Sequence, residues 1–177
     1  TGEVMVARAN AHVKYPCRFM LVAAANPGKC GYLSDPGRAC SRAPICGEDY
    51  LGRISGPLMD RFDMRIEVPP VAFRDLDLPP SGDNSATVAE RVATARTVQA
   101  QRYGDRPGLR TNADVQGQML EEVCAHDSES HELMRRAADR FGLSARGYHR
   151  VLRVARTIAD LDREDAILRP HVAEALS

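Results

Sequence analysis

Residues 19–27 have the sequence FMLVAAANP, an apolar run that ends abruptly in Asn26 and Pro27. Such a continuous apolar run predicts a buried strand in a parallel sheet that is covered on both faces. Pro27 has no backbone N–H to donate to a neighbouring strand, so the strand should end there. Sheets of this kind bind ligands beyond the carboxyl ends of their strands, which is where Asn26 would lie. A buried strand followed by an ordinary Asn-Pro turn is the simpler alternative.

A second informative stretch is GLSARGYHRVLRVARTIADL at residues 142–161. Its apolar residues recur at helical spacing and form one stripe: Val151, Val154, Ala155, Ile158 and Leu161. Arg146, Arg150 and Arg153 share a different face of the same helix, which Ser144 should cap. In the first turn the charge of Arg146 opposes the helix dipole, and an arginine at a helix N-terminus is suited to bind phosphate. A solvated basic face is the alternative.

The third stretch is SGPLMDRFD at residues 55–63, in which Arg61 stands close to Asp60 and Asp63. An arginine between two acids usually forms an internal ion pair in a turn, and the residues alone favour that interpretation. After this stretch, residues 64–68 alternate like a strand before Pro69.

These three segments, in this order, resemble those of the magnesium-chelatase-like AAA+ ATPases, in particular the ComM competence type. The resemblance covers essentially the whole chain. It implies an α+β fragment of a P-loop AAA+ (α/β) fold, with a partial sheet and β-hairpin followed by an α-helical bundle lid.

The resemblance also implies roles for single residues. Asn26 matches the sensor 1 asparagine, which orients the attacking water or senses the γ-phosphate. Arg61 matches the arginine finger, which acts on the nucleotide of a neighbouring subunit and so requires an oligomer. Arg146 matches the sensor 2 arginine, and Arg150 is a second candidate for contact with the nucleotide.

Residues 3–15 predict a β-hairpin, because alternating residues surround a polar turn. In the family that the chain resembles, a hairpin just before sensor 1 projects into the central pore of a ring. Four side chains would then face DNA: Arg8, Asn10, His12 and Lys14. An ordinary solvated hairpin tip is an equally good interpretation.

Cys30, Cys40 and Cys46 lie together in residues 28–50, a segment that is rich in Gly and Pro. Five cysteines in all, an odd number, favour reduced thiols or a metal site over a disulfide framework. Structural Zn²⁺ needs four ligands, and these thiols supply three. A His or Asp35 is a candidate fourth ligand, whereas reduced surface thiols are the alternative.

The other two cysteines, Cys17 and Cys124, are expected to be packed thiols. Relatives in the resembling family carry cysteines in a pattern that begins Asn-Pro-Cys. This chain has Gly28 at that position, which puts a complete four-cysteine site in doubt.

Three regions are expected: residues 1–70 as part of an AAA+ core, residues 71–83 as a Pro-rich linker, and residues 84–177 as a helical lid. Besides the helix from Ser144, helical periodicity places helix starts near Ser85, Asn112, Asp127 or Ser128, and Pro170. Their inward residues are expected to include Val88, Val92, Ala95, Val98, Val115, Leu120, Met134, Ala137 and Phe141.

The sequence of 177 residues contains no Gly-x-x-x-x-Gly-Lys-Ser/Thr loop and no apolar strand ending in paired acids. The chain is therefore expected to be a C-terminal piece that does not hydrolyse ATP alone and needs an upstream part to hold ATP and Mg²⁺. Formal net charge is zero, so contact with nucleic acid must come from a local patch. We expect a cytoplasmic protein without membrane contact.

The leading functional hypothesis is a ring-forming motor that couples ATP hydrolysis to DNA remodelling. The intact protein is expected to form the ring as a homo-oligomer, a hexamer. The DNA step would be branch migration or a helicase-like movement connected with competence. One alternative is a magnesium chelatase motor subunit that drives insertion of Mg²⁺ into a porphyrin. Another is a helical interaction module without catalysis.

Overall fold

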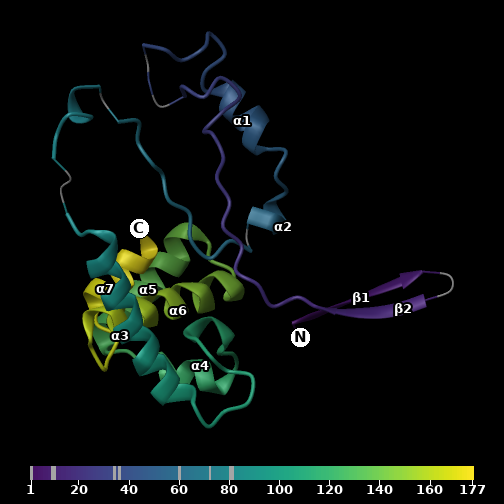
Figure 1. Ribbon diagram of the computed structural model, residues 1–177, viewed down its shortest axis with the longest axis vertical. Helices are drawn as coiled ribbons and strands as arrows, with labels where there is room; N and C mark the ends of the chain where they lie inside the picture. Colours follow the sequence, from purple (N-terminus) through teal and green to yellow (C-terminus); the bar gives the residue numbers. More distant parts are fainter. Residues whose placement is uncertain are drawn as a thin grey trace. The chain divides into compact units, whose positions relative to one another are not determined.

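A computed structural model describes residues 2–8, 11–33, 35, 37–59, 61–71, 73–79 and 82–177 (Figure 1). Their contacts divide the chain into two compact units, Thr1–Ser55 and Gly56–Ser177. Each is described by itself below. Together they contain a two-stranded sheet and a set of helices, so the chain is of mixed α and β structure as expected.

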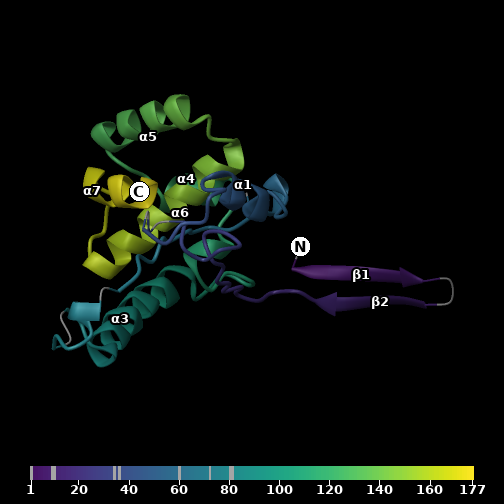
Figure 2. The ribbon, with the colours of Figure 1, turned by 90° about the horizontal axis from the view of Figure 1, so that it is seen from above.

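The first unit begins with the predicted hairpin. β1 (Glu3–Arg8) pairs with β2 (Ala11–Pro16) in an antiparallel register that sets Val6 opposite Val13 (Figure 2). Directly paired residues of an antiparallel ladder share a face. One face therefore carries Val4, Val6, Arg8, Ala11, Val13 and Tyr15, and the other carries Glu3, Met5, Ala7, His12, Lys14 and Pro16.

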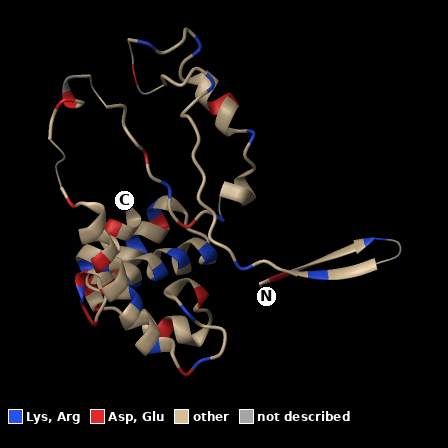
Figure 3. Ribbon diagram, viewed as in Figure 1, with Lys and Arg blue, Asp and Glu red and all other residues tan. Residues whose placement is uncertain are grey.

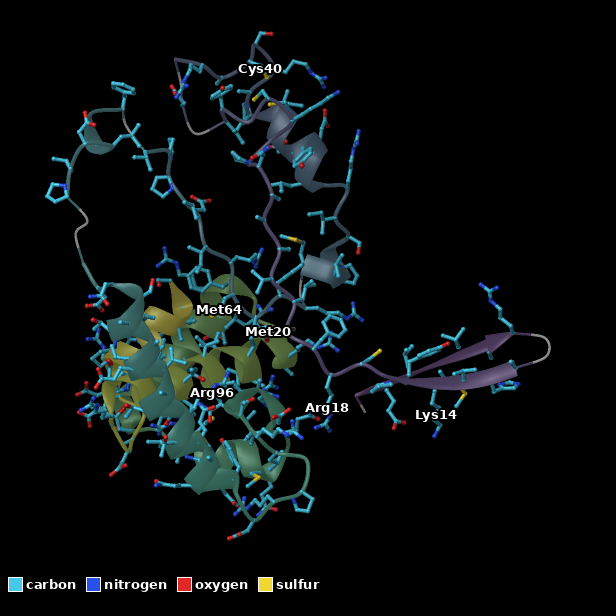
Figure 4. The ribbon with its side chains drawn as sticks, in the orientation of Figure 1. Lys14, Arg18, Met20, Cys40, Met64 and Arg96 are labelled. Atoms are coloured by element: carbon cyan, nitrogen blue, oxygen red, sulfur yellow. The ribbon has the colours of Figure 1, made fainter. Side chains whose placement is uncertain are left out.

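The buried strand predicted over residues 19–25 is not found. That segment is irregular and exposed, with 86% of Met20 and 82% of Val22 accessible to solvent (Figure 4). A strand needs a partner for its backbone groups, and the sheet formed by the described residues consists of β1 and β2 alone. The apolar side chains of residues 19–25 are thus suited to burial, but the described residues do not cover them.

The strand predicted over residues 64–68, which lie in the second unit, is not found either. They form no ladder, and 75% of Ile66 and 85% of Val68 are exposed. The rest of the first unit is largely loop with one helix, α1 (Ile45–Leu51). The second unit opens with a single turn, α2 (Gly56–Met59), and a 3-10 turn, η1 (Phe73–Asp75).

The helices of the second unit begin close to the predicted residues, except that the helix expected from Asn112 is a 3-10 turn followed by a separate helix from Gln118. They are α3 (Ser85–Tyr103), η2 (Asn112–Asp114), α4 (Gln118–Val123), α5 (Ser128–Phe141), α6 (Ala145–Asp162) and α7 (Arg169–Leu176). Asn84 caps α3, which begins at the predicted start Ser85, because the Asn84 side chain accepts the backbone N–H of Thr87. Asp127, one of the two predicted starts, caps α5, and Gly142 ends this helix in the left-handed conformation (φ 60°).

The core of this unit lies where α6 meets its neighbours. Its fully buried residues include Val115, Leu120, Met134, Ala155, Ile167 and Val172. Three residues that were expected inside are exposed: Val88 (45%), Val92 (44%) and Phe141 (59%). In α3 the buried residues are Ala95, Gln99 and Tyr103, because only the C-terminal half of that helix contacts α6 and η2.

A buried polar network joins α3, η2 and α6. The Asp160 carboxylate, 1% exposed, accepts hydrogen bonds from Arg102 Nη2 (2.6 Å), Asn112 Nδ2 (2.8 Å) and Arg156 Nε (3.0 Å). Arg156 is 2% exposed and also donates to the backbone carbonyl of Asp165 at 2.7 Å. Burial opposes ionisation of Asp160, but these donors outweigh it and hold the pKa of its carboxyl below the usual value. The network fixes the position of α6, the helix that carries the predicted phosphate-binding arginines.

Candidate functional site

The structure brings the three loop cysteines together. Cys40 Sγ lies 3.3 Å from Cys46 Sγ, Cys30 Sγ lies 3.8 Å from Cys46 Sγ, and all three sulfur atoms lie within 4.8 Å of one another (Figure 4). Cys46 is buried in the first turn of α1, whereas Cys30 and Cys40 are partly exposed on the loop before it. This is the arrangement that the predicted metal site requires of its three thiols.

The surroundings of the three thiols make them chemically unequal. Hydrogen bonds to the backbone of Tyr32 and Cys40 lower the pKa of Cys30 to about 7. The hydrogen bond with Cys40, together with burial, raises the pKa of Cys46 to about 11. Near neutral pH the cluster therefore contains thiolate character at Cys30, and a thiolate is the form that binds metals.

Asp35, a predicted fourth ligand, is used elsewhere. Its carboxylate accepts hydrogen bonds from Arg38 Nε (2.7 Å) and from the backbone N–H of Gly37 (3.1 Å). The bond from Arg38 is the main cause of its lowered pKa. In the described part of the chain, the group that could hold a metal ion consists of Cys30, Cys40 and Cys46 only.

The remaining cysteines differ from each other. Cys124 is 2% exposed, and burial raises the pKa of its thiol to about 11, as befits a packed thiol. Cys17, which was expected to be packed in the same way, is exposed, because it follows β2 in the unpaired segment of the first unit.

Arg61 lies just after α2, and its Nη1 donates a 2.7 Å hydrogen bond to the backbone carbonyl of Pro57. Asp60, one of the acids expected to pair with it, lies outside the described residues. The Arg61 side chain is exposed, and its guanidinium points back to Pro57 in α2. Pro57, four residues before Arg61, thus contributes a backbone acceptor that helps to position the arginine side chain.

The arginines of α6 have three different environments. Ser144 accepts the backbone N–H of Gly147 at 3.1 Å and caps the helix as predicted, and Arg146 is exposed in the first turn. Arg150 donates from Nη1 to the backbone carbonyl of Phe62 at 2.8 Å. Arg153 is half-buried, and its Nε finds no hydrogen-bond partner among the described residues.

Within the second unit, then, the Arg61 segment and α6 are in direct contact through Phe62 and Arg150. Asn26 is exposed in the first unit, directly before Pro27. Its convergence with Arg61 and Arg146 stays a prediction. The contact from Arg150 to Phe62 had no sequence signal, because 88 residues separate the two.

The hairpin residues expected to face DNA divide between its two faces. Arg8 shares a face with the valines, whereas His12 and Lys14 share the other, where Lys14 Nζ lies 3.9 Å from Glu3 Oε2. Asn10 lies outside the described residues. Figure 3 shows Lys and Arg positions among Asp and Glu positions on the helices of the second unit. Because the formal net charge is zero, contact with nucleic acid must come from a local patch of basic side chains.

Comparison with protein families gives two adjoining matches. Residues 1–76 match the model described as "Magnesium chelatase, subunit ChlI", and residues 82–177 match "Magnesium chelatase, subunit ChlI C-terminal". The chain belongs to this magnesium-chelatase-like family, which is of the AAA+ ATPase type.

Its curated relatives share more than a third of their aligned residues with it. Competence protein ComM of Haemophilus influenzae is 40% identical over 177 residues, which cover 99% of this chain and 33% of ComM. The uncharacterized protein YifB of Escherichia coli is 37% identical over 179 residues, which cover 100% of this chain and 34% of YifB. An uncharacterized protein of Mycobacterium tuberculosis is 42% identical over 180 residues, covering 99% of this chain and 34% of the relative. The chain thus spans about a third of the length of these relatives.

Among the described residues, no helix combines the length and the apolar character needed to cross a bilayer.

Proposed function

We propose that this chain is the C-terminal portion of a ring-forming AAA+ ATPase that couples ATP binding and hydrolysis to DNA remodelling, by branch migration or a helicase-like movement. Family membership and the similarity to a competence protein support the proposal. The observation that carries it is the contact of Arg150 with Phe62, which joins the helix of Arg146 to the segment of Arg61. A motor needs such a link between two parts of the nucleotide machinery.

In this proposal the three polar groups act on one triphosphate at each subunit interface. Asn26 orients the attacking water, for which an amide is suited because it offers both a donor and an acceptor without charge. Arg146 donates to the phosphates from the first turn of α6, where backbone N–H groups also favour an anion. Arg61 acts in trans on the charge that develops at the γ-phosphate, an effect of about three to five decades in rate for such arginines.

The exposed apolar segments are consistent with a larger assembly. Residues 19–22 and Ile66 and Val68 expose side chains that are ordinarily buried. In the proposed whole protein, other strands of the AAA+ sheet cover them, together with the parts that hold ATP and Mg²⁺. Residues 1–70 then belong to the core, residues 71–83 form the linker and residues 84–177 form the lid, a division compatible with the family matches over 1–76 and 82–177.

The hairpin supplies the proposed contact with DNA. Arg8, His12 and Lys14 are exposed on the two-stranded arm of β1 and β2, and Asn10, outside the described residues, is proposed to contact DNA with them. Arg8 and Lys14 lie on opposite faces of this arm, so the proposal requires that both faces approach the DNA in the ring. Phosphate contacts of this kind are independent of DNA sequence and sensitive to salt.

ATP turnover of the full-length protein tests the proposed function. Branched DNA is expected to stimulate ATP hydrolysis, and a porphyrin with Mg²⁺ is expected to have no effect. Stimulation by the porphyrin and not by DNA would assign the protein to the chelatase motors instead. A protein that binds neither nucleotide nor DNA would be a helical interaction module.

A further inference from the structure

We propose that Cys30, Cys40 and Cys46 form a three-thiolate site for a thiophilic divalent cation such as Zn²⁺, with an open fourth position next to Gly28. The site is independent of the nucleotide chemistry proposed above. Its role is to fold the loop that contains α1.

The sulfur positions agree with this coordination. A tetrahedral Zn²⁺ with Zn–S bonds of about 2.3 Å sets its sulfur ligands about 3.8 Å apart. The distance from Cys30 Sγ to Cys46 Sγ is 3.8 Å, and the distance from Cys40 Sγ to Cys46 Sγ is 3.3 Å. The remaining pair, Cys30 and Cys40, lies within 4.8 Å. A cation at the centre of the cluster therefore requires small adjustments of the sulfur positions, including an opening of the Cys40–Cys46 pair.

The loop of residues 28–55, which contains α1, has little apolar packing of its own. Among its described residues, those classed as buried are Gly28, Cys46 and Gly47, and all three lie at the cluster. Units that cannot build a hydrophobic core commonly depend on disulfides or a structural metal. Because binding of a metal to a folded site contributes directly to folding, a cation here would supply the stabilisation that apolar packing does not.

The fourth position is open in this chain. Both oxygens of Asp35 are held by Arg38 and Gly37, and no other described His, Asp or Glu joins the three thiols. A Cβ built on Gly28 would lie 3.3 Å from Gly47 Cα and 3.8 Å from the carbonyl carbon of Cys46. A side chain at position 28 would thus begin beside the backbone of Cys46, one of the three proposed ligands. Three protein ligands and one exchangeable ligand leave the cation accessible.

Metal analysis of the full-length protein tests the site. The protein, purified with reductant and without chelator, is expected to carry about one zinc per chain. Cys30→Ser, Cys40→Ser and Cys46→Ser should each lose it, while Cys17→Ser, which changes an exposed cysteine of the same unit, should keep it. Replacement of zinc by Co²⁺ should give the charge-transfer absorption of three thiolates, a readout that does not depend on any variant.

A gain-of-ligand variant tests the open position. Gly28→Cys should add a fourth thiolate to the cobalt spectrum and slow the loss of zinc to a chelator by about tenfold or more, since even outer-sphere partners change affinity by about 10–100-fold. Gly28→Ser and Gly28→Ala control for the close approach to Gly47. Zinc at background level, zinc retained in all three Cys→Ser variants, or a Cys40–Cys46 disulfide in place of free thiols would each overturn the proposal. An unchanged spectrum in a folded Gly28→Cys protein would overturn the assignment of the fourth position.

Discussion

Arg150 reaches from α6 to the backbone of Phe62, and its Nη1 donates a 2.8 Å hydrogen bond to that carbonyl oxygen. Phe62 directly follows Arg61, the proposed arginine finger. The helix that carries Arg146, the proposed sensor 2 arginine, is therefore hydrogen-bonded to the residue next to the proposed arginine finger. A shift of α6 on nucleotide binding would be transmitted to the finger through this bond.

Arg150→Ala should therefore affect catalysis more than binding. Hydrogen bonds that involve a charged group contribute about 1.5–3 kcal/mol, so we expect kcat for ATP to fall by about tenfold or more in the full-length protein. KM should change little, because the lost bond ends on Phe62. Arg135→Ala, which removes an exposed arginine of α5, is the control. A raised KM with unchanged kcat would instead make Arg150 a phosphate contact.

Removal of the Asp160 charge should destabilise the helical unit. Asp160→Asn leaves the buried Arg156 without its carboxylate, and breaking a buried ion pair in this way costs about 3–5 kcal/mol. Urea denaturation followed by circular dichroism measures the free energy of unfolding. Asp165→Asn is the matched control, since only its backbone carbonyl bonds to Arg156. A loss below about 1 kcal/mol for Asp160→Asn would show that the network is not a source of stability.

The same network predicts a response to acid. The folded pKa of Asp160 lies below its unfolded value, so the folded state is stabilised above the unfolded pKa, which is about 3.9. That contribution is lost as the pH falls through the folded pKa. Midpoints of urea unfolding measured between pH 7 and pH 3 should decrease most at the acidic end, and Asp160→Asn should flatten that dependence. Equal slopes for the two proteins would contradict this assignment.

The hairpin prediction concerns salt. Arg8→Ala and Lys14→Ala should each weaken DNA binding by the full-length protein to a similar extent for all sequences, and should lower the slope of log affinity against log salt by about 1. Glu3→Gln removes the acidic neighbour of Lys14 and should leave binding unchanged or strengthen it. Fluorescence anisotropy across a salt series measures both quantities. Unchanged slopes would mean that the hairpin does not contact phosphates.

Local signals in the sequence predicted the helices well. Ser144, Asp127 and Gly142 act within one turn of their own positions, so their capping roles follow from residue type and spacing. Partners distant in the sequence were not predictable. The exposure of Val88 depends on where α3 contacts α6, and the state of residues 19–25 depends on a neighbouring strand.

The candidate sites show the same limit. Spacing suggested that the three cysteines act together, but only the folded loop shows their sulfur atoms within 4.8 Å of one another. It also shows that Asp35 is bound to Arg38 and that Gly28 faces Gly47. Arg156 and Asp160 are four residues apart on one helix, a spacing that favours an ion pair. This pair could have been predicted from the sequence, but the prediction for this helix considered Arg146, Arg150 and Arg153 instead.

The most direct test of the account mixes two inactive variants of the full-length protein. Asn26→Ala damages a subunit's own site, whereas Arg61→Ala damages the site of its neighbour, so each ring alone should lack ATP turnover while still binding ATP. In mixed rings, an Arg61→Ala subunit next to an Asn26→Ala subunit regains one intact site, and ATP hydrolysis should reappear. Mixed rings that stay as inactive as the separate variants, or an Arg61→Ala protein with normal turnover, would contradict the proposal that these residues meet at a shared nucleotide.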